Sequence, residues 1–259
     1  MRIITASSTW NLTVVPNAFA MGGLAADIVA DTVRVKPNAV VSVPTGTTPL
    51  TLFEELAARS RRGEIDLSRI ELFCLDDYVG VTADDPNSLT GWLKSAFIDR
   101  AGIDPDHVHA VPAAATDLAS ATLAYERDLA ALGGLDLAIV GLGPNGHVAY
   151  NEPGSLADSR TRVVSLTAES RAQAAAYWRH SVPIPRSAVT IGVGTLLDAK
   201  QIVLVVTGES KAEMLRRTLE ERTSADVPAS WLRLAKNRLM VITDEAAASR
   251  LSGRRVSHS

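Results

Sequence analysis

Runs of apolar residues alternate along the chain with longer segments whose apolar positions recur every three or four residues. Continuous rather than alternating Val, Ile and Leu runs are typical of strands that are covered on both faces, as in a parallel sheet. The segments between them have the period of amphipathic helices. The strand-like runs are 39–43, 70–75, 135–140, 162–166, 201–206 and 238–242. This order predicts an α/β fold of three layers, α/β/α, with a mostly parallel, doubly wound, Rossmann-like sheet.

The alternation is not interrupted by a linker. Prolines and glycines stand singly at the ends of the expected elements, and 259 residues are enough to bury a full core. We therefore expect a single domain over 1–259. The last residues, 252–259, are polar and are expected to fray.

Composition and charge favour a small-molecule ligand over a macromolecule. Hydrophobic residues make up 46% of the chain and charged residues 21%, and the formal net charge is −3, so there is no electrostatic reason to expect nucleic acid as a partner. No apolar stretch reaches the roughly 18 residues that a membrane span needs, and the first residues lack the apolar segment of a signal peptide. The single cysteine, Cys74, lies in an apolar run and is expected to be a buried hydrophobe. We expect a cytoplasmic protein with no membrane partner.

Ligands of open parallel sheets bind beyond the carboxyl ends of the strands, so the loops that follow the strands are the first candidates for a site. The loop after 39–43 reads Pro44-Thr-Gly-Thr-Thr-Pro49. Gly46 allows backbone N–H groups to approach an anion, Thr48 can cap the next helix, and the N-terminus of that helix favours phosphate. Thr45 and Thr47 complete a candidate phosphate loop, although an ordinary capped turn explains the same residues.

Two adjacent acids, Asp76 and Asp77, follow the run 70–75 and precede Tyr78. They are either solvated loop residues and helix caps or, at the ligand edge of the sheet, a general base for a carbon acid next to a carbonyl. Their position at the end of a strand favours the second interpretation.

The third loop, Gly141-Leu-Gly-Pro-Asn-Gly-His-Val-Ala-Tyr-Asn-Glu-Pro-Gly154, brings a histidine and a carboxylate to a glycine-rich turn. His147 is a candidate proton carrier, and Glu152 is close enough in sequence to orient it. One histidine with scattered acids does not have the clustered ligands of a zinc or iron site, so no metal is expected. After the run 201–206, Lys211 is either a phosphate ligand or a solvated residue of the first helical turn.

The combined motifs resemble the glucosamine-6-phosphate deaminase (isomerase) family, in order and through nearly the whole chain. They are Pro44-Thr-Gly-Thr-Thr-Pro49, Leu75-Asp-Asp-Tyr-Val-Gly80, the loop 141–153, Ser159-Arg-Thr-Arg162, Thr190-Ile-Gly-Val-Gly-Thr-Leu-Leu-Asp198 and Gly208-Glu-Ser-Lys-Ala212. The resemblance implies conversion of glucosamine 6-phosphate and water to fructose 6-phosphate and ammonia without a metal or cofactor, in amino-sugar (N-acetylglucosamine) catabolism.

The resemblance also implies roles for single residues. Asp76 corresponds to the carboxylate that moves a proton between C2 and C1 of the open-chain sugar, with Asp77 and Tyr78 beside it. His147 corresponds to the histidine that assists ring opening, and Glu152 to the carboxylate that pairs with it. The phosphate cradle corresponds to Thr45, Gly46, Thr47, Thr48 and Lys211.

The sequence departs from the family pattern in three respects, at four positions. Asn145 stands where many members have aspartate, which changes how His147 is tuned. Ala176 stands where an arginine usually holds the phosphate, and Arg179, three residues on, is expected to replace it. Leu156 and Val164 stand where allosteric relatives have the serine and lysine of a second phosphate site. We therefore expect no activation by N-acetylglucosamine 6-phosphate, and a monomer or small homo-oligomer.

Other functions remain open at this point. They are deamination of galactosamine 6-phosphate or of an atypically phosphorylated amino sugar, hydrolysis of 6-phosphogluconolactone on the same fold, and a non-catalytic sugar-phosphate sensor. The run Asn151-Glu-Pro153 and the pair Asp76 and Asp77 favour the deaminase over the lactonase. The sensor is disfavoured because the chain has no helix-turn-helix segment or basic patch.

Overall fold

The computed structural model describes residues 2–4, 10–175 and 183–252. In this part of the chain, eight strands form a central sheet in the order β1-β2-β11-β10-β7-β3-β4-β6. Seven of them run parallel, and β1 pairs with β2 in the antiparallel direction. The strands are β1 (Arg2–Ile4), β2 (Asn11–Val15), β3 (Val40–Ser42), β4 (Glu71–Phe73), β6 (Val108–His109), β7 (Leu137–Gly141), β10 (Gln201–Val206) and β11 (Leu239–Asp244).

Helices cover both faces of this sheet, as predicted. Because side chains alternate across a strand, Val40 and Val41 of β3 enter two different apolar clusters. One cluster contains Phe53 and the other contains Leu215. The helices on the Phe53 face are α1 (Ala18–Val35), α2 (Leu50–Arg61), α3 (Leu89–Leu93) and α4 (Asp99–Ala101), with a π-helical turn at Lys94–Ile98, and those on the Leu215 face are α5 (Leu118–Ala131), α7 (Val193–Leu197) and α8 (Ala212–Glu220). Shorter 3₁₀ segments lie at Pro105–His107, Glu209–Lys211, Pro228–Arg238 and Ala247–Arg250.

The direction of winding reverses between β3 and β7, which are neighbours in the centre of the sheet. From β3 the chain moves outward to β4 and β6, whereas from β7 it moves the other way to β10 and β11. The loops that leave β3 and β7 therefore diverge. Such a switch point opens a crevice at the carboxyl ends of the two strands.

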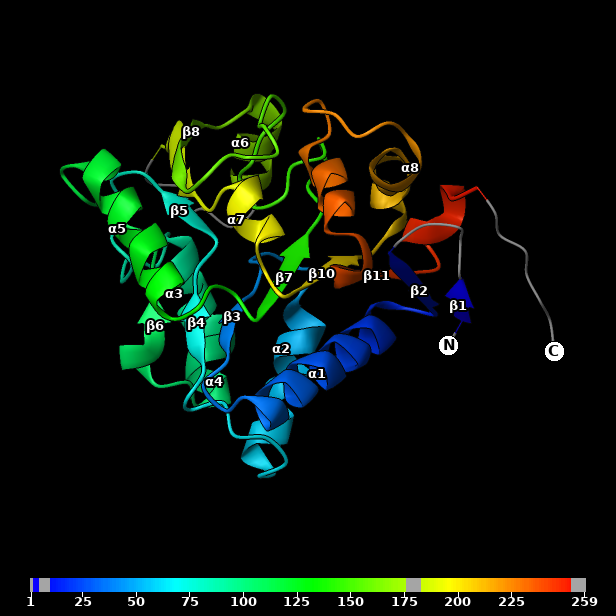
Figure 1. Ribbon diagram of the computed structural model, residues 1–259, viewed down its shortest axis with the longest axis horizontal. Coiled ribbons are helices and arrows are strands. Elements are labelled where there is room, and N and C mark those ends of the chain that lie inside the picture. Colours follow the sequence, from blue (N-terminus) through cyan, green and yellow to red (C-terminus); the bar gives the residue numbers. More distant parts are fainter. Residues whose placement is uncertain (1, 5–9, 176–182, 253–259) are drawn as a thin grey trace.

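A second, smaller sheet lies beyond that edge, at the top of Figure 1 with helix α6 (Ala168–Ala175). It is antiparallel, in the order β5-β9-β8, and consists of β5 (Asp76–Tyr78), β9 (Ser187–Thr190) and β8 (Arg162–Ser165). A third apolar cluster lies at this sheet and contains Tyr78, Tyr150 and Leu166. The prediction that 162–166 belongs to the parallel sheet is therefore wrong. Side-chain exposure alternates along β8, which is typical of a strand with one solvated face, whereas it stays low along a strand that is covered on both faces.

The other five strand predictions correspond to β3, β4, β7, β10 and β11. Two further strands of the parallel sheet, β2 and β6, were not predicted. Cys74 is buried, and burial raises the pKa of its thiol to about 12. At the start of the expected frayed tail, the Ser252 hydroxyl donates to Glu220 Oε2 at 2.8 Å, so this residue is held, whereas 253–259 lie outside the described residues. None of the described helices is long and apolar enough to cross a membrane.

Candidate active site

A cavity of about 150 Å³ lies at the carboxyl edge of the sheet, at the switch point. Its walls come from the segments that follow β3, β4, β7 and β10. Predicted site residues that line it are Thr45, Gly46, Thr47, Thr48, Asp76, Tyr78, His147 and Lys211. Asp77, Asn145 and Glu152 do not line it. Arg179 and Ala176 lie outside the described residues, so the predicted replacement of the phosphate arginine stays a prediction.

The threonine loop forms one wall of the cavity. Gly46 has a φ of 100°, which an L side chain rarely adopts, so the turn requires glycine here. Helix α2 starts at Leu50 with Pro49 in the capping position and without a side-chain cap, so the prediction that Thr48 caps it is wrong. Proline fixes the backbone at this position, and Leu50 N–H bonds instead to Thr47 O at 3.3 Å.

Lys211 gives the cavity a positive charge. It ends the short turn after β10 and is not paired with any described acidic residue in an ion pair. Burial lowers the pKa of its ammonium group. A half-buried cation without a counterion, next to a loop at a helix N-terminus, is a suitable place for an anion.

The two acids of the second loop have different surroundings. They form β5 of the small sheet, where alternate residues face opposite sides, so Asp76 and Tyr78 reach the cavity and Asp77 does not. Asp77 is buried and accepts backbone N–H bonds from Tyr78 at 2.8 Å, Leu89 at 2.9 Å and Thr90 at 3.0 Å. Asp77 therefore fixes the start of α3 to β5 beside the cavity.

Asp76 is a buried carboxyl group with few donors. Burial and, second, the charge of Asp77 raise its pKa to about 8, while the Tyr150 N–H acts weakly in the other direction. Its carboxyl group is thus able to gain or lose a proton close to neutral pH.

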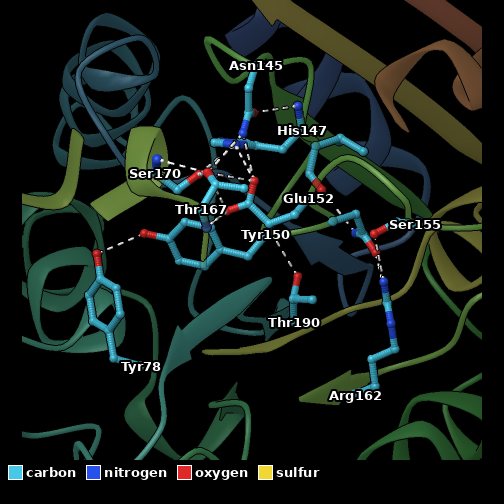
Figure 2. Close-up of polar contacts among 12 residues, drawn as sticks. Tyr78, Asn145, His147, Tyr150, Glu152, Ser155, Arg162, Thr167, Ser170 and Thr190 are labelled. Atoms are coloured by element: carbon cyan, nitrogen blue, oxygen red, sulfur yellow. Dashed lines mark hydrogen bonds and ion pairs between the residues drawn. The ribbon is translucent and has the colours of Figure 1, made fainter. Parts of the chain in front are cut away.

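His147 stands on the glycine loop between β7 and β8. A Cβ at Gly143 would lie 2.2 Å from the imidazole Nε2, so only glycine leaves room for the ring. His147 Nδ1 is 3.2 Å from Ser170 Oγ and 3.7 Å from Glu152 Oε2, which is longer than a hydrogen bond. The imidazole lines the cavity and has these polar partners behind it (Figure 2).

Glu152 is the centre of the network behind His147 (Figure 2). Asn145 Nδ2 donates to Glu152 Oε2 at 2.7 Å, and Thr167 N–H donates to Oε1 at 3.0 Å. Burial alone would raise the pKa of Glu152, but its contacts with His147, Ser170, Thr167 and Asn145 outweigh burial and lower the pKa to about 2. Glu152 is therefore a permanent negative charge behind the imidazole of His147.

Asn145 joins the loop to this network at both ends of its amide. Its Oδ1 accepts the His147 backbone N–H at 3.2 Å while its Nδ2 bonds Glu152. An aspartate at this position would place a second negative charge 2.7 Å from Glu152 Oε2. The amide avoids that repulsion and supplies a donor instead.

Three residues of the site were missed by sequence reasoning: Thr167, Ser170 and Tyr150. Thr167 Oγ1 accepts the Ser170 N–H at 3.2 Å, which is the geometry of a helix N-cap. A threonine three residues before a serine at the start of a helix is the sequence pattern that could have indicated this pair. Tyr150 lines the cavity, and its hydroxyl is 2.8 Å from that of Tyr78. No sequence signal pointed to this pair.

The arrangement combines a titratable carboxyl, an imidazole backed by a carboxylate, and an anion site in one cavity. These groups suit proton transfer on a phosphorylated substrate. Among the described residues, no group of three or more His, Cys, Asp or Glu side chains is arranged to hold a metal ion.

Comparison with known proteins identifies relatives along most of the chain. The family model of glucosamine-6-phosphate isomerases/6-phosphogluconolactonase matches residues 18–241. The glucosamine-6-phosphate deaminase of Pseudarthrobacter chlorophenolicus is 42% identical over 231 residues, which cover 89% of this chain and 88% of that protein. The enzyme of the same name from Streptomyces coelicolor is 39% identical over 239 residues, covering 92% and 91%.

Solved structures give the same relationship. A monomeric glucosamine-6-phosphate deaminase superposes with a TM-score of 0.88 at 34% identity, covering 92% of this chain and 98% of that one. The 6-phosphogluconolactonase from Trypanosoma cruzi has a TM-score of 0.72 at 20% identity over 93% and 97%, a likeness of fold alone. The chain belongs to the family of glucosamine-6-phosphate isomerases and 6-phosphogluconolactonases, on its glucosamine-6-phosphate deaminase branch.

Proposed function

We propose that this protein is a glucosamine-6-phosphate deaminase that converts glucosamine 6-phosphate and water to fructose 6-phosphate and ammonia. One observation carries the proposal: Asp76, His147 and Lys211, from three separate loops, line a single cavity. The deaminase relatives at 36–42% identity support the same substrate.

The proposed chemistry is a proton transfer followed by hydrolysis of a C–N bond. His147 assists opening of the sugar ring by handling the O5 and O1 protons. Asp76 then takes the proton from C2 and returns it to C1, which converts the amino aldehyde through an enolamine to a C2 iminium ion. Water adds to that carbon, ammonia leaves and the ketone remains. A base with a pKa of about 8 is matched to such a reversible transfer near neutral pH.

The remaining residues bind or orient the substrate in this proposal. The loop Thr45, Gly46, Thr47 and Thr48 holds the phosphate with Lys211, and Arg179 supplies the further cation expected in place of Ala176. Glu152 and Asn145 orient His147, and Asp77 supports the segment that contains Asp76 and Tyr78. No metal takes part, because acid–base groups alone account for each step.

The direct test is ammonia release from a panel of phosphorylated and unphosphorylated 2-amino sugars, before and after dialysis against a chelator. We expect glucosamine 6-phosphate to be the best substrate, with equal rates before and after dialysis. Preference for galactosamine 6-phosphate would reassign the substrate but keep the reaction. Cleavage of 6-phosphogluconolactone with no ammonia from any sugar would overturn the proposal.

Phosphate binding has its own test. Arg179→Ala and Lys211→Gln are expected to raise KM for glucosamine 6-phosphate more than they lower kcat, because both remove a charge that holds the phosphate before and during the reaction. An unchanged KM in Arg179→Ala would show that this residue does not replace the arginine missing at Ala176.

We further propose a monomer or small homo-oligomer without activation by N-acetylglucosamine 6-phosphate, in amino-sugar catabolism. A solved deaminase that is monomeric supports the first part. Light scattering after gel filtration tests the size, and a sigmoidal rate curve made hyperbolic by that compound would contradict the second part. The cytoplasmic location stays a prediction.

A further inference from the structure

Two tyrosine hydroxyls meet in the wall of the cavity. Tyr78 Oη and Tyr150 Oη are 2.8 Å apart, and both side chains are largely buried (Figure 2). Both residues line the cavity that also contains Asp76 and His147. The roles proposed above for Asp76 and His147 make no use of the Tyr150 hydroxyl.

The fold holds this pair beside the reacting groups. Tyr78 is two residues from Asp76 on β5, so both side chains leave the same face of the strand. The Tyr150 N–H donates to Thr190 Oγ1 at 3.0 Å, and Thr190 is the cross-strand partner of Asp76. Ala149, the residue before Tyr150, has a φ of 48°, which L residues seldom adopt.

The ring of Tyr150 lies between two other rings of the site. It meets the His147 ring edge to face, with centroids 5.9 Å apart, and the Tyr78 ring at 5.8 Å. Tyr150 is therefore in contact with both groups, and packing leaves its hydroxyl little freedom to move.

The Tyr150 phenol stays protonated at all relevant pH values, because burial raises its pKa well above 10 and the neighbouring Tyr78 and Asp76 act in the same direction. A phenol has one proton and two lone pairs. Whichever of the two hydroxyls donates in the Tyr78–Tyr150 hydrogen bond, the Tyr150 hydroxyl can still form a hydrogen bond with a further polar group. It does not act as a base.

We propose that Tyr150, oriented by Tyr78, determines specificity by hydrogen-bonding a sugar hydroxyl beyond C2, at C3 or C4. The inference rests on the deaminase function proposed above. In the proposed binding mode, C1 and C2 of the sugar lie at Asp76 and His147, and the phosphate lies at Lys211. The sugar hydroxyls between these two ends need polar partners in the wall of the cavity. A deoxy analogue that lacks this sugar hydroxyl would leave the buried Tyr150 hydroxyl without a partner. That cost disfavours the analogue relative to the parent sugar.

The test measures kcat/KM for ammonia release from glucosamine 6-phosphate and from its 3-deoxy and 4-deoxy analogues. The wild type should favour the parent over one analogue by about tenfold, the effect of one neutral hydrogen bond. Tyr150→Phe should lower kcat/KM for the parent by about that factor and leave the same analogue unchanged. Tyr78→Phe should weaken the preference for the parent less, because it removes only the group that orients Tyr150.

The ratio of kcat/KM for the parent sugar to kcat/KM for an analogue is measured within one variant, so any unfolded fraction of that variant cancels from the ratio. Tyr125→Phe is the matched control: its hydroxyl is also buried and bonds Cys74 O at 2.6 Å, but it does not line the cavity. Its ratio should equal that of the wild type. If Tyr150→Phe lowers kcat/KM equally for the parent and both analogues, or leaves kcat/KM for the parent unchanged, the inference is overturned. If wild type releases no ammonia from the parent, the proposed function fails instead.

Discussion

The two carboxyl groups at the centre of the site, Asp76 on β5 and Glu152 on the glycine loop, are both buried, yet the pKa of the first is raised and that of the second is lowered. Asp76 has a pKa of about 8 and Glu152 of about 2. Their exposed fractions are equal, at 6% each. The difference lies in their surroundings: contacts with His147, Ser170, Thr167 and Asn145 lower the pKa of Glu152. Asp76 is the more strongly desolvated of the two, and only the Tyr150 N–H opposes the effects of burial and of the Asp77 charge.

This contrast shows how one site can contain two kinds of acid, one in the wall of the cavity and one behind it. A carboxylate that accepts several hydrogen bonds keeps its charge and orients its neighbour, whereas one without them exchanges a proton near neutral pH. The contrast supports the proposed roles, proton transfer for Asp76 and a fixed charge for Glu152. Variants that remove either group test the assignment.

The largest expected effect is that of Asp76→Asn. Loss of a general base should lower kcat for ammonia release by about 10²- to 10⁴-fold. Because burial raises the pKa of Asp76, its tendency to ionise disfavours the folded state at pH 7, so the neutral amide should raise the midpoint of thermal unfolding at that pH.

Asp77→Asn is the matched control for that variant. It has the same chemical change one residue away, at a carboxylate that accepts three backbone N–H bonds and does not line the cavity. It should cost about 1–3 kcal/mol of unfolding free energy and less activity per folded molecule than Asp76→Asn. The reverse order of the two activities would break the assignment.

The next largest effect is expected for Glu152→Gln. The change removes the charge behind His147 and should lower kcat by about 10- to 100-fold, as loss of an outer partner does for metal-bound histidines. Because folding lowers the pKa of Glu152, its stabilisation is present above the ordinary pKa of 4.5 and is lost as pH falls toward 2. Urea unfolding at several pH values should thus show that the free energy of unfolding of Glu152→Gln falls less steeply in acid than that of the wild type. Equal declines would show that Glu152 is not a fixed charge.

The smallest effect is expected for Ser170→Ala. Ser170 Oγ lies 3.2 Å from both His147 Nδ1 and Thr167 Oγ1, so the change loosens the imidazole without removing a charge. We expect kcat to fall about two- to tenfold with KM unchanged, the effect of one neutral hydrogen bond. Ser165→Ala, at an exposed residue of β8, is the control and should change neither constant. A change in KM alone would place Ser170 in substrate binding instead.

The core of the fold could be predicted because buried parallel strands have continuous apolar runs. Strand β10, for example, is buried at every residue from Ile202 to Val206. The small sheet could not be predicted in the same way, since β5 is Asp76–Tyr78 and β8 has alternating exposure. Strand β6 has only two residues and therefore no pattern to detect. The single domain over 1–259 stays a prediction.

The loops of the site could be predicted because chain order alone brings strand ends to one edge of a parallel sheet. The partner Ser170 could not, because only tertiary packing brings this residue of α6 to His147 on the glycine loop. The pKa of Asp76 likewise depends on tertiary structure. Burial also raises the pKa of its neighbour Asp77, but backbone N–H bonds to Asp77 oppose that effect, and the sequence does not show which of the two carboxyl groups receives them.

The most direct test of the contrast between the two acids is an NMR titration of protein labelled with ¹³C at the aspartate and glutamate side-chain carboxyl carbons. We predict one aspartate resonance that titrates near pH 8 and is absent from Asp76→Asn, while the resonance assigned through Glu152→Gln stays ionised down to about pH 3, because its pKa is about 2. An Asp76 resonance that titrates below pH 5 would contradict the account.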